Sequence, residues 1–262
     1  MNILDELADY ACYRVSEAEK KIPEEEMRDA AEALGGGTGF PFEKALAAPG
    51  ISFITEVKKA SPSKGLIAPD FPYLQIAEAY QKAGASAISC LTEPKWFQGS
   101  DQYLKEIAAH VTIPVLRKDF TVSPYMIWQA RALGASAVLL ICAILDEQEL
   151  TEYRNIAESV GLSALVEAHD EKEVEMALRS GAKIIGVNNR NLKDFTVDIR
   201  NSERLRKMVP DDIIFVSESG IRTADDVARL YRNGTNAVLI GETLMRSSDK
   251  KGMLDELRSQ IV

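Results

Sequence analysis

One pattern recurs four times along this chain and limits its fold more than any other feature. The segments AGASAISCL, LGASAVLLI, SGAKIIGVN and NGTNAVLIG each read as a helix end, a glycine turn and a buried strand. Their glycines, Gly84, Gly134, Gly181 and Gly234, lie about 50 residues apart. Between them fall four further apolar runs with β propensity, SFITEV, PVLRKD, SALVEA and IIFVSES. A strand therefore recurs about every 25 residues, with room for one helix between neighbouring strands.

Eight strands that alternate with helices predict parallel connections and a closed (β/α)8 barrel. Two helix starts support the count: Ser123 precedes a proline, and Asp146 with Glu149 has the spacing of a capping box. A doubly wound open sheet is the competing architecture, but the first turn carries no dinucleotide fingerprint. We predict one α/β barrel domain over residues 1–262, with residues 1–48 as an N-terminal helical extension and flexible glycine linker (GGGTG) that covers one mouth.

Composition narrows the class of partner. The formal charge of −9 and the pI near 5.0 argue against nucleic acid or an anionic membrane, so a bound anion needs a local basic pocket. Three scattered cysteines and the absence of a basic, apolar leader predict a reducing, cytoplasmic location. The two histidines lie in no metal-binding motif, so we predict no metal centre. We also predict a small phosphorylated molecule as the partner of a monomer or weak homo-oligomer.

The carboxyl ends of barrel strands converge on one site, so the residues found there are the candidates for chemistry. Side chains two residues apart on a strand share a face, which places Glu56 and Lys58 together. A single charged residue at the end of a strand is usually exposed to solvent and has no chemical role. Several charged residues that converge indicate a site with shifted pKa values. The polar candidates are Glu56, Lys58, Lys118, Glu167, Asn188, Arg190, Glu218 and Ser219. The strands that end at Leu91 and Ile141 contribute apolar ends.

Neighbouring residues have structural interpretations. Alternation turns Arg117 and Asp119 away from Lys118, which favours a structural role for both. His169 is a possible proton carrier, but capping or lining the next helix is the favoured interpretation. Trp96 and Phe97 form either a lid over an aromatic ligand or a loop tucked onto the rim of the barrel.

The last two strand–helix turns have a sequence pattern typical of anion binding. SESGIRT and LIGETLMR each place a glycine beside a helix start, where backbone N–H groups receive phosphate in this fold. Ser61 and Ser63 offer hydroxyl groups from the loop after the first strand, and Arg190 offers charge. Glycine at such a turn also serves tight packing, so this signal is moderate alone.

Six short motifs, read together, resemble one family. EVKKASPSKG, VLRKDF, VEAH, IGVNNRNL, VSESGI and IGETLMR, in this order, are similar to the indole-3-glycerol phosphate synthases of tryptophan biosynthesis. The resemblance covers the chain from about residue 50 onward. It implies a cofactor-free ring closure of 1-(2-carboxyphenylamino)-1-deoxyribulose 5-phosphate, with loss of carbon dioxide and water.

The resemblance also implies residue roles. Lys118 would be the general acid at the ketone oxygen, Glu167 would stabilise the developing cation, and Asn188 would orient both substrate and catalytic groups. Lys58, held by Glu56, would bind the substrate carboxylate or act as acid in the dehydration. Glu218 and Ser219 would help to position the catalytic groups. The implied phosphate site comprises Ser61, Gly220, Gly241, the backbone of Glu242 and nearby Arg190, with the Glu242 side chain turned away.

This chemistry calls for an ammonium acid whose pKa is lowered by burial and a second nearby cation. Two alternatives stay open at this point. One is another phosphosugar barrel enzyme, an isomerase or a lysine Schiff-base lyase; the other is a non-catalytic protein that binds a phosphorylated ligand.

Overall fold

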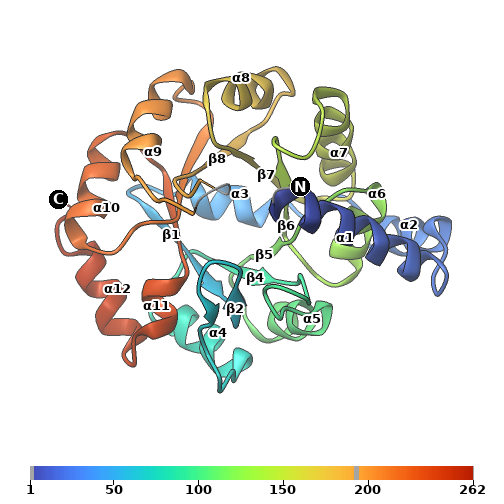
Figure 1. The fold of residues 1–262 in the computed structure, drawn as a ribbon, viewed down its shortest axis with the longest axis horizontal. Helices are drawn as coiled ribbons and strands as arrows, with labels where there is room; N and C mark the ends of the chain where they lie inside the picture. Colours follow the sequence, from blue (N-terminus) through green and yellow to red (C-terminus); the bar gives the residue numbers. More distant parts are fainter. Residues whose placement is uncertain (1–2, 192–194, 262) are drawn as a thin grey trace.

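The computed structural model describes residues 3–191 and 195–261 and has a closed barrel of parallel strands at its centre (Figure 1). Neighbouring strands follow the order β1-β10-β9-β8-β7-β6-β5-β4, so the first and last strands meet and close the sheet. The barrel strands are β1 (Ser52–Val57), β4 (Ala87–Leu91), β5 (Val115–Lys118), β6 (Ala137–Ile141), β7 (Ser163–Ala168), β8 (Ile184–Asn188), β9 (Ile214–Glu218) and β10 (Ala237–Ile240). The predicted (β/α)8 fold is confirmed.

Helices surround the barrel and connect successive strands (Figure 1). Ser123 caps its helix through the backbone N–H of Tyr125, and Asp146 forms a reciprocal capping box with Glu149, as predicted. Within the described ranges, no helix is both long and apolar enough to cross a membrane. The outer helices are α4 (Tyr73–Lys82), α5 (Asp101–His110), α6 (Pro124–Ala132), α7 (Glu147–Ser159), α8 (Glu171–Arg179), α9 (Arg200–Leu205) with a 3-10 turn (Arg206–Met208), α10 (Ala224–Arg232), α11 (Glu242–Arg246) and α12 (Lys250–Arg258).

The loop after β1 contains a small antiparallel ribbon that the sequence analysis did not predict. Its strands, β2 (Ala60–Ser61) and β3 (Gly65–Leu66), pair residue by residue. Runs of two residues are too short to show the alternation that identifies a strand. The ribbon gives Ser61 and Ser63 a defined place beside the mouth of the barrel.

The predicted N-terminal helical extension forms three helices: α1 (Ile3–Glu19), α2 (Glu24–Glu32) and α3 (Pro41–Leu46). The side chains inside the barrel form one apolar cluster, to which α1 adds Leu4 and Leu7 and α3 adds Phe42 and Leu46. Ser52, at the start of β1, donates to a carbonyl oxygen of α3, so α3 covers the amino ends of the strands. Helix α1 lies over the opposite, carboxyl ends, as its place in Figure 1 shows.

The glycine run at residues 35–39 is packed against the barrel, which corrects the expectation of a flexible linker. Thr38 donates a 2.7 Å hydrogen bond to the carbonyl oxygen of Gly161. A Cβ on Gly36 would lie 2.5 Å from the carbonyl oxygen of Ser159, so only glycine allows this approach. At Gly36 glycine is needed because two backbones touch there.

Candidate active site

A cavity of about 470 Å³ opens at the carboxyl ends of the strands, beneath α1 and the β1 loop. Its wall has three parts: a group of acids and lysines on the barrel floor, an apolar side and a basic rim. Every predicted catalytic and phosphate-binding residue borders it: Glu56, Lys58, Ser61, Lys118, Glu167, Asn188, Arg190, Glu218, Ser219, Gly220, Gly241 and Glu242. The convergence expected from the strand ends is therefore present.

Lys118, the last residue of β5, stands at the centre of the charged group. Its Nζ lies 2.9 Å from Glu167 Oε2 on β7 and 3.5 Å from Glu218 Oε2 on β9. The two carboxylates are almost completely buried, whereas the Lys118 side chain retains 15% exposure toward the cavity. A ligand in the cavity can therefore contact the ammonium group.

The electrostatic setting of Lys118 is opposite to the one predicted from sequence. Burial alone would lower the pKa of Lys118, but the charges of Glu167, Glu218 and Glu56 outweigh burial and raise it. The expectation of a lowered lysine pKa was wrong, because the nearest charges are carboxylates rather than a second cation. Lys118 is consequently a firmly protonated ammonium group at neutral pH.

The two carboxylates beside Lys118 differ from each other. Burial opposes ionisation of both, but Lys118, His169 and the Asn188 amide together hold the pKa of Glu167 well below its usual range. For Glu218, burial and the charges of Glu167 and Glu56 prevail over Lys118 and raise the pKa to about 8. One carboxylate is thus ionised and the other carries a proton near pH 7.

Two glycines make room for these side chains. Glu56 and Lys58 on β1 contact each other directly, and a Cβ on Gly241 would lie 2.3 Å from Glu56 Oε1. A Cβ on Gly186 of β8 would lie 2.3 Å from Glu218 Oε1. At both positions any larger residue would displace a charged group of the site, so the need for glycine there is steric.

Asn188 and Ser219 occupy the neighbouring strand ends. Asn188 Nδ2 donates to Glu167 Oε1 at 3.3 Å, while its Oδ1 accepts from the backbone N–H of Arg190 at 3.0 Å. Ser219 has a positive φ of 67°, which is uncommon for a residue other than glycine. The Asn189 amide holds this turn through the Ser219 carbonyl oxygen, at 3.1 Å.

The predicted phosphate residues gather at the rim of the cavity together with cations that the sequence analysis did not name. Arg190 borders the cavity, and so do Lys64, Arg222 and Arg246. The carboxylate of Glu242 lies 3.1 Å from Arg246 Nε and 3.7 Å from Lys64 Nζ. These pairings draw the Glu242 side chain toward the rim cations, and the charges of Lys64 and Arg246 offset its own.

The apolar wall includes a contribution from α1 that the sequence analysis missed. Ile3 and Leu7 line the cavity together with Phe97, Phe120 and Ile141. The predicted apolar ends of β4 and β6 are present at Leu91 and Ile141. No spacing in the first 20 residues could have shown that one face of α1 contacts strand ends more than 100 residues away.

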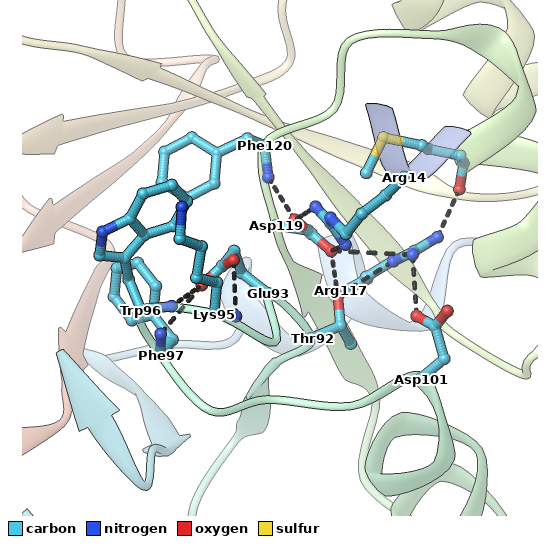
Figure 2. A network of polar contacts seen from close by, with 11 residues as sticks. Arg14, Thr92, Glu93, Lys95, Trp96, Phe97, Asp101, Arg117, Asp119 and Phe120 are labelled. Atoms are coloured by element: carbon cyan, nitrogen blue, oxygen red, sulfur yellow. Dashed lines mark hydrogen bonds and ion pairs between the residues drawn. The ribbon is translucent and has the colours of Figure 1, made fainter. Parts of the chain in front are cut away.

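Figure 2 shows how the residues around β5 are held. Asp119 is fully buried and accepts from Arg14 of α1 and from Thr92, while Arg117 donates to the Met126 carbonyl oxygen and to Asp101. The predicted structural roles of Arg117 and Asp119 agree with these contacts.

The loop after β4 is shaped by a single buried acid. Glu93 accepts from the backbone N–H groups of Lys95, Trp96 and Phe97 at 2.7 to 2.9 Å. Trp96 then packs edge-on against Tyr10 of α1, with ring centroids 5.5 Å apart, while Phe97 faces the cavity. The loop is fixed on the rim, and one of its two aromatic rings reaches the site.

His169 lies next to Glu167 of the charged group. Asp170, not His169, caps helix α8, so the capping interpretation of the histidine was wrong, although it does line the start of that helix. Its ring lies between Glu173 of α8, at 3.1 Å, and Glu167, at 3.6 Å.

Comparison with known proteins gives a consistent result. A family model described as indole-3-glycerol phosphate synthase matches residues 4–257. A protein of that name from Ruminiclostridium cellulolyticum is 57% identical over 98% of both chains, and one from Lacticaseibacillus casei is 61% identical over 80% of both. The solved structure of a thiamine phosphate pyrophosphorylase from Pyrococcus furiosus covers 83% of this chain and 96% of its own at 16% identity and a TM-score of 0.61, which shows the fold alone.

Proposed function

This chain belongs to the indole-3-glycerol phosphate synthase family, and from that premise we propose how the residues of its cavity carry out the reaction. The activity is the synthesis of indole-3-glycerol phosphate, a carboxy-lyase step of tryptophan biosynthesis. The substrate is taken to be 1-(2-carboxyphenylamino)-1-deoxyribulose 5-phosphate. It must close a five-membered ring, lose carbon dioxide and expel water.

The three parts of the cavity suit the three parts of this substrate. The phosphate would lie at the basic rim, with Arg190, the Ser61 hydroxyl group and the backbone of Gly220, Gly241 and Glu242. The aromatic ring would pack against the apolar wall. The carboxylate would then face Lys58, which Glu56 holds in place.

Lys118 would be the general acid. The observation that carries the proposal is its ammonium group, held 2.9 Å from Glu167 and 3.5 Å from Glu218 and still open to the cavity. It would polarise and protonate the ketone oxygen while the aromatic carbon attacks. Its raised pKa keeps the proton available at neutral pH, and the charge developing on the ketone oxygen supplies the driving force for transfer.

Glu167 would stabilise the cation that forms in the ring and would accept a proton from it, because it is ionised and lies beside Lys118. Asn188 would fix its orientation through Oε1. Glu218, largely protonated near pH 7, and Ser219 would position these groups. Lys58 would bind the substrate carboxylate or serve as the acid in the dehydration.

The decisive assay follows indole fluorescence from the purified protein and the proposed substrate. We expect turnover by the wild-type protein and a loss of about 10² to 10⁴ in kcat for Lys118→Ala, the usual contribution of one positioned acid. Lys105→Ala, an exposed lysine on α5, is the matched control and should keep full activity. Circular dichroism confirms that each variant folds.

Three outcomes would count against this assignment. Near-normal turnover in Lys118→Ala would remove Lys118 from the mechanism. Borohydride trapping of a substrate adduct on Lys58 or Lys118 would indicate a Schiff-base route instead. Substrate binding without turnover by the wild-type protein would leave a phosphate-ligand binding role.

We also propose a cytoplasmic location and a monomer or weak homo-oligomer. Cys12, Cys90 and Cys142 are free thiols, two of them buried, which suits a reducing compartment. Sedimentation across a range of concentrations would establish the oligomeric state.

A further inference from the structure

The ring of His169 lies between two carboxylates on different elements. Its Nδ1 lies 3.1 Å from Glu173 Oε2 on α8, and its Nε2 lies 3.6 Å from Glu167 Oε1 on β7. The same Glu173 oxygen accepts the backbone N–H of His169 at 2.7 Å, which anchors the whole residue. Nε2 is buried and, within the described part of the chain, has no hydrogen-bond partner, and the Glu167 carboxylate lies at ion-pair distance from it.

This arrangement favours a particular protonation state. A ring nitrogen that faces a carboxylate oxygen is stable when it carries a proton and repelled when it presents a lone pair. In His169 both nitrogens face carboxylates, so both favour a proton. A neutral ring would leave one lone pair against a negative oxygen in a buried place, which is costly.

We propose that His169 is a positioning residue, an imidazolium that links Glu173 to the catalytic carboxylate of Glu167. The two oxygens of Glu167 then divide their partners: Oε2 faces Lys118 at 2.9 Å, while Oε1 faces Asn188 at 3.3 Å and His169 at 3.6 Å. His169 thereby adds a positive charge to the groups that keep Glu167 ionised and oriented toward the substrate. This inference rests on the proposed role of Glu167.

The surroundings of the ring agree with a positive charge on it. Burial alone would lower the pKa of His169, but Glu173 and Glu167 outweigh burial and raise it. A second cavity, of about 580 Å³, borders the ring on its other side. There the basic residues Arg200 and Arg204 are paired with Asp198 and Glu171. The charged groups that line this cavity with His169 are Asp170, Glu173, Arg190, Asp198, Arg200 and Arg204.

The first test reads the charge directly and needs no turnover. The chain has two histidines, so a His110→Gln variant leaves one set of imidazole signals for a pH titration by nitrogen NMR. We expect a His169 pKa above the ordinary 6.5 and a fall of that pKa in Glu167→Gln and in Glu173→Gln. Glu175→Gln, an exposed acid on α8, is the control and should leave it unchanged. A neutral ring at pH 6, or a pKa indifferent to Glu167, would overturn the proposal.

The second test is kinetic and separates positioning from mere structure. His169→Asn keeps a donor only near Glu173, and His169→Gln places one near Glu167 without a titrating charge. We expect kcat to fall about tenfold in His169→Asn, because the positive charge beside Glu167 is lost, and to recover in part in His169→Gln, which restores a donor there. The decline of kcat as pH rises through the His169 pKa should disappear in His169→Gln.

Each other kinetic result has a definite meaning. Wild-type kcat and pH profile in both variants would refute the proposal. Equal losses in both variants, matched by equal losses in thermal stability, would show a purely structural histidine and refute it as well. If the wild-type protein turned over no substrate, the proposed function would fail while the NMR titration would still report on the pairing of His169 with Glu167.

Discussion

Arg14 of α1 donates two hydrogen bonds, of 2.6 and 3.1 Å, to the carboxylate of Asp119, the residue that follows Lys118. The Asp119 side chain is fully buried, and Arg14 retains only 17% exposure. The same helix supplies Ile3 and Leu7 to the cavity wall. One ion pair therefore joins the N-terminal extension to the backbone that carries the proposed general acid, as Figure 2 shows.

Replacing this arginine should weaken both the fold and the site. Arg14→Met leaves Asp119 with Thr92 and Arg117, so we expect the free energy of unfolding to fall by about 2 kcal/mol. KM should rise because α1 no longer holds the apolar wall. Urea denaturation and steady-state kinetics measure the two effects, with Arg28→Met, a partly exposed arginine on α2, as control. An unchanged denaturation midpoint together with an unchanged KM would contradict this account.

The raised pKa of Glu218 predicts a pH-dependent stability. In the folded protein this carboxyl keeps its proton up to about pH 8, whereas in the unfolded chain it loses it near its ordinary value of 4.5. The folded state thus binds the extra proton between these pH values, so the contribution of Glu218 to stability declines as pH rises through this window. The steepest slope available to one group is about 1.4 kcal/mol per pH unit.

Glu218→Gln should remove that decline, because the amide has nearly the same shape and does not titrate. The measurement is the difference in unfolding free energy between variant and wild type from pH 4.5 to 8.5, which cancels the other titrating groups. Glu175→Gln provides the matched control. A difference that stays constant across the range would mean that Glu218 titrates normally.

The space left by Gly186 predicts a steric effect on the site. In Gly186→Ala the new Cβ would meet Glu218 Oε1 at 2.3 Å and Leu165 Cδ1 at 3.1 Å. Glu218 must then move, and we expect kcat to fall about 10²-fold, as small displacements in active sites typically cause. Gly37→Ala, where a Cβ meets nothing within 4 Å, should behave as wild type. Full activity in Gly186→Ala would show that the Glu218 position is unimportant.

The basic rim predicts a binding effect rather than a chemical one. Arg190→Met should raise KM about tenfold and raise the inhibition constant of inorganic phosphate by a similar factor, since one charged hydrogen bond is lost. We expect kcat to change little. Arg179→Met, an exposed arginine on α8, is the control. A loss in kcat alone would move Arg190 from the phosphate site to the reacting groups.

Sequence reasoning located the residues of the charged group because strand periodicity and barrel topology determine which side chains share the mouth of the barrel. It succeeded for Lys118, Glu167 and Glu218 for that reason. It missed Ile3, Leu7 and Arg14, since their contacts depend on how α1 lies across the barrel. It also predicted the wrong direction for the shift of the Lys118 pKa. That shift depends on which charges lie next to the ammonium group, and the sequence does not show these short distances. The β2–β3 ribbon was too short for any pattern to reveal.

The pairing of Arg14 with Asp119 has a consequence for folding during synthesis of the chain. The arginine leaves the ribosome about 100 residues before its partner, and β1 must await β10, the last strand of the barrel, before the sheet can close. When α1 is made, the strand ends that its apolar face covers have therefore not yet been made. The segment that adds Ile3 and Leu7 to the cavity wall is therefore made well before the strand ends that it covers.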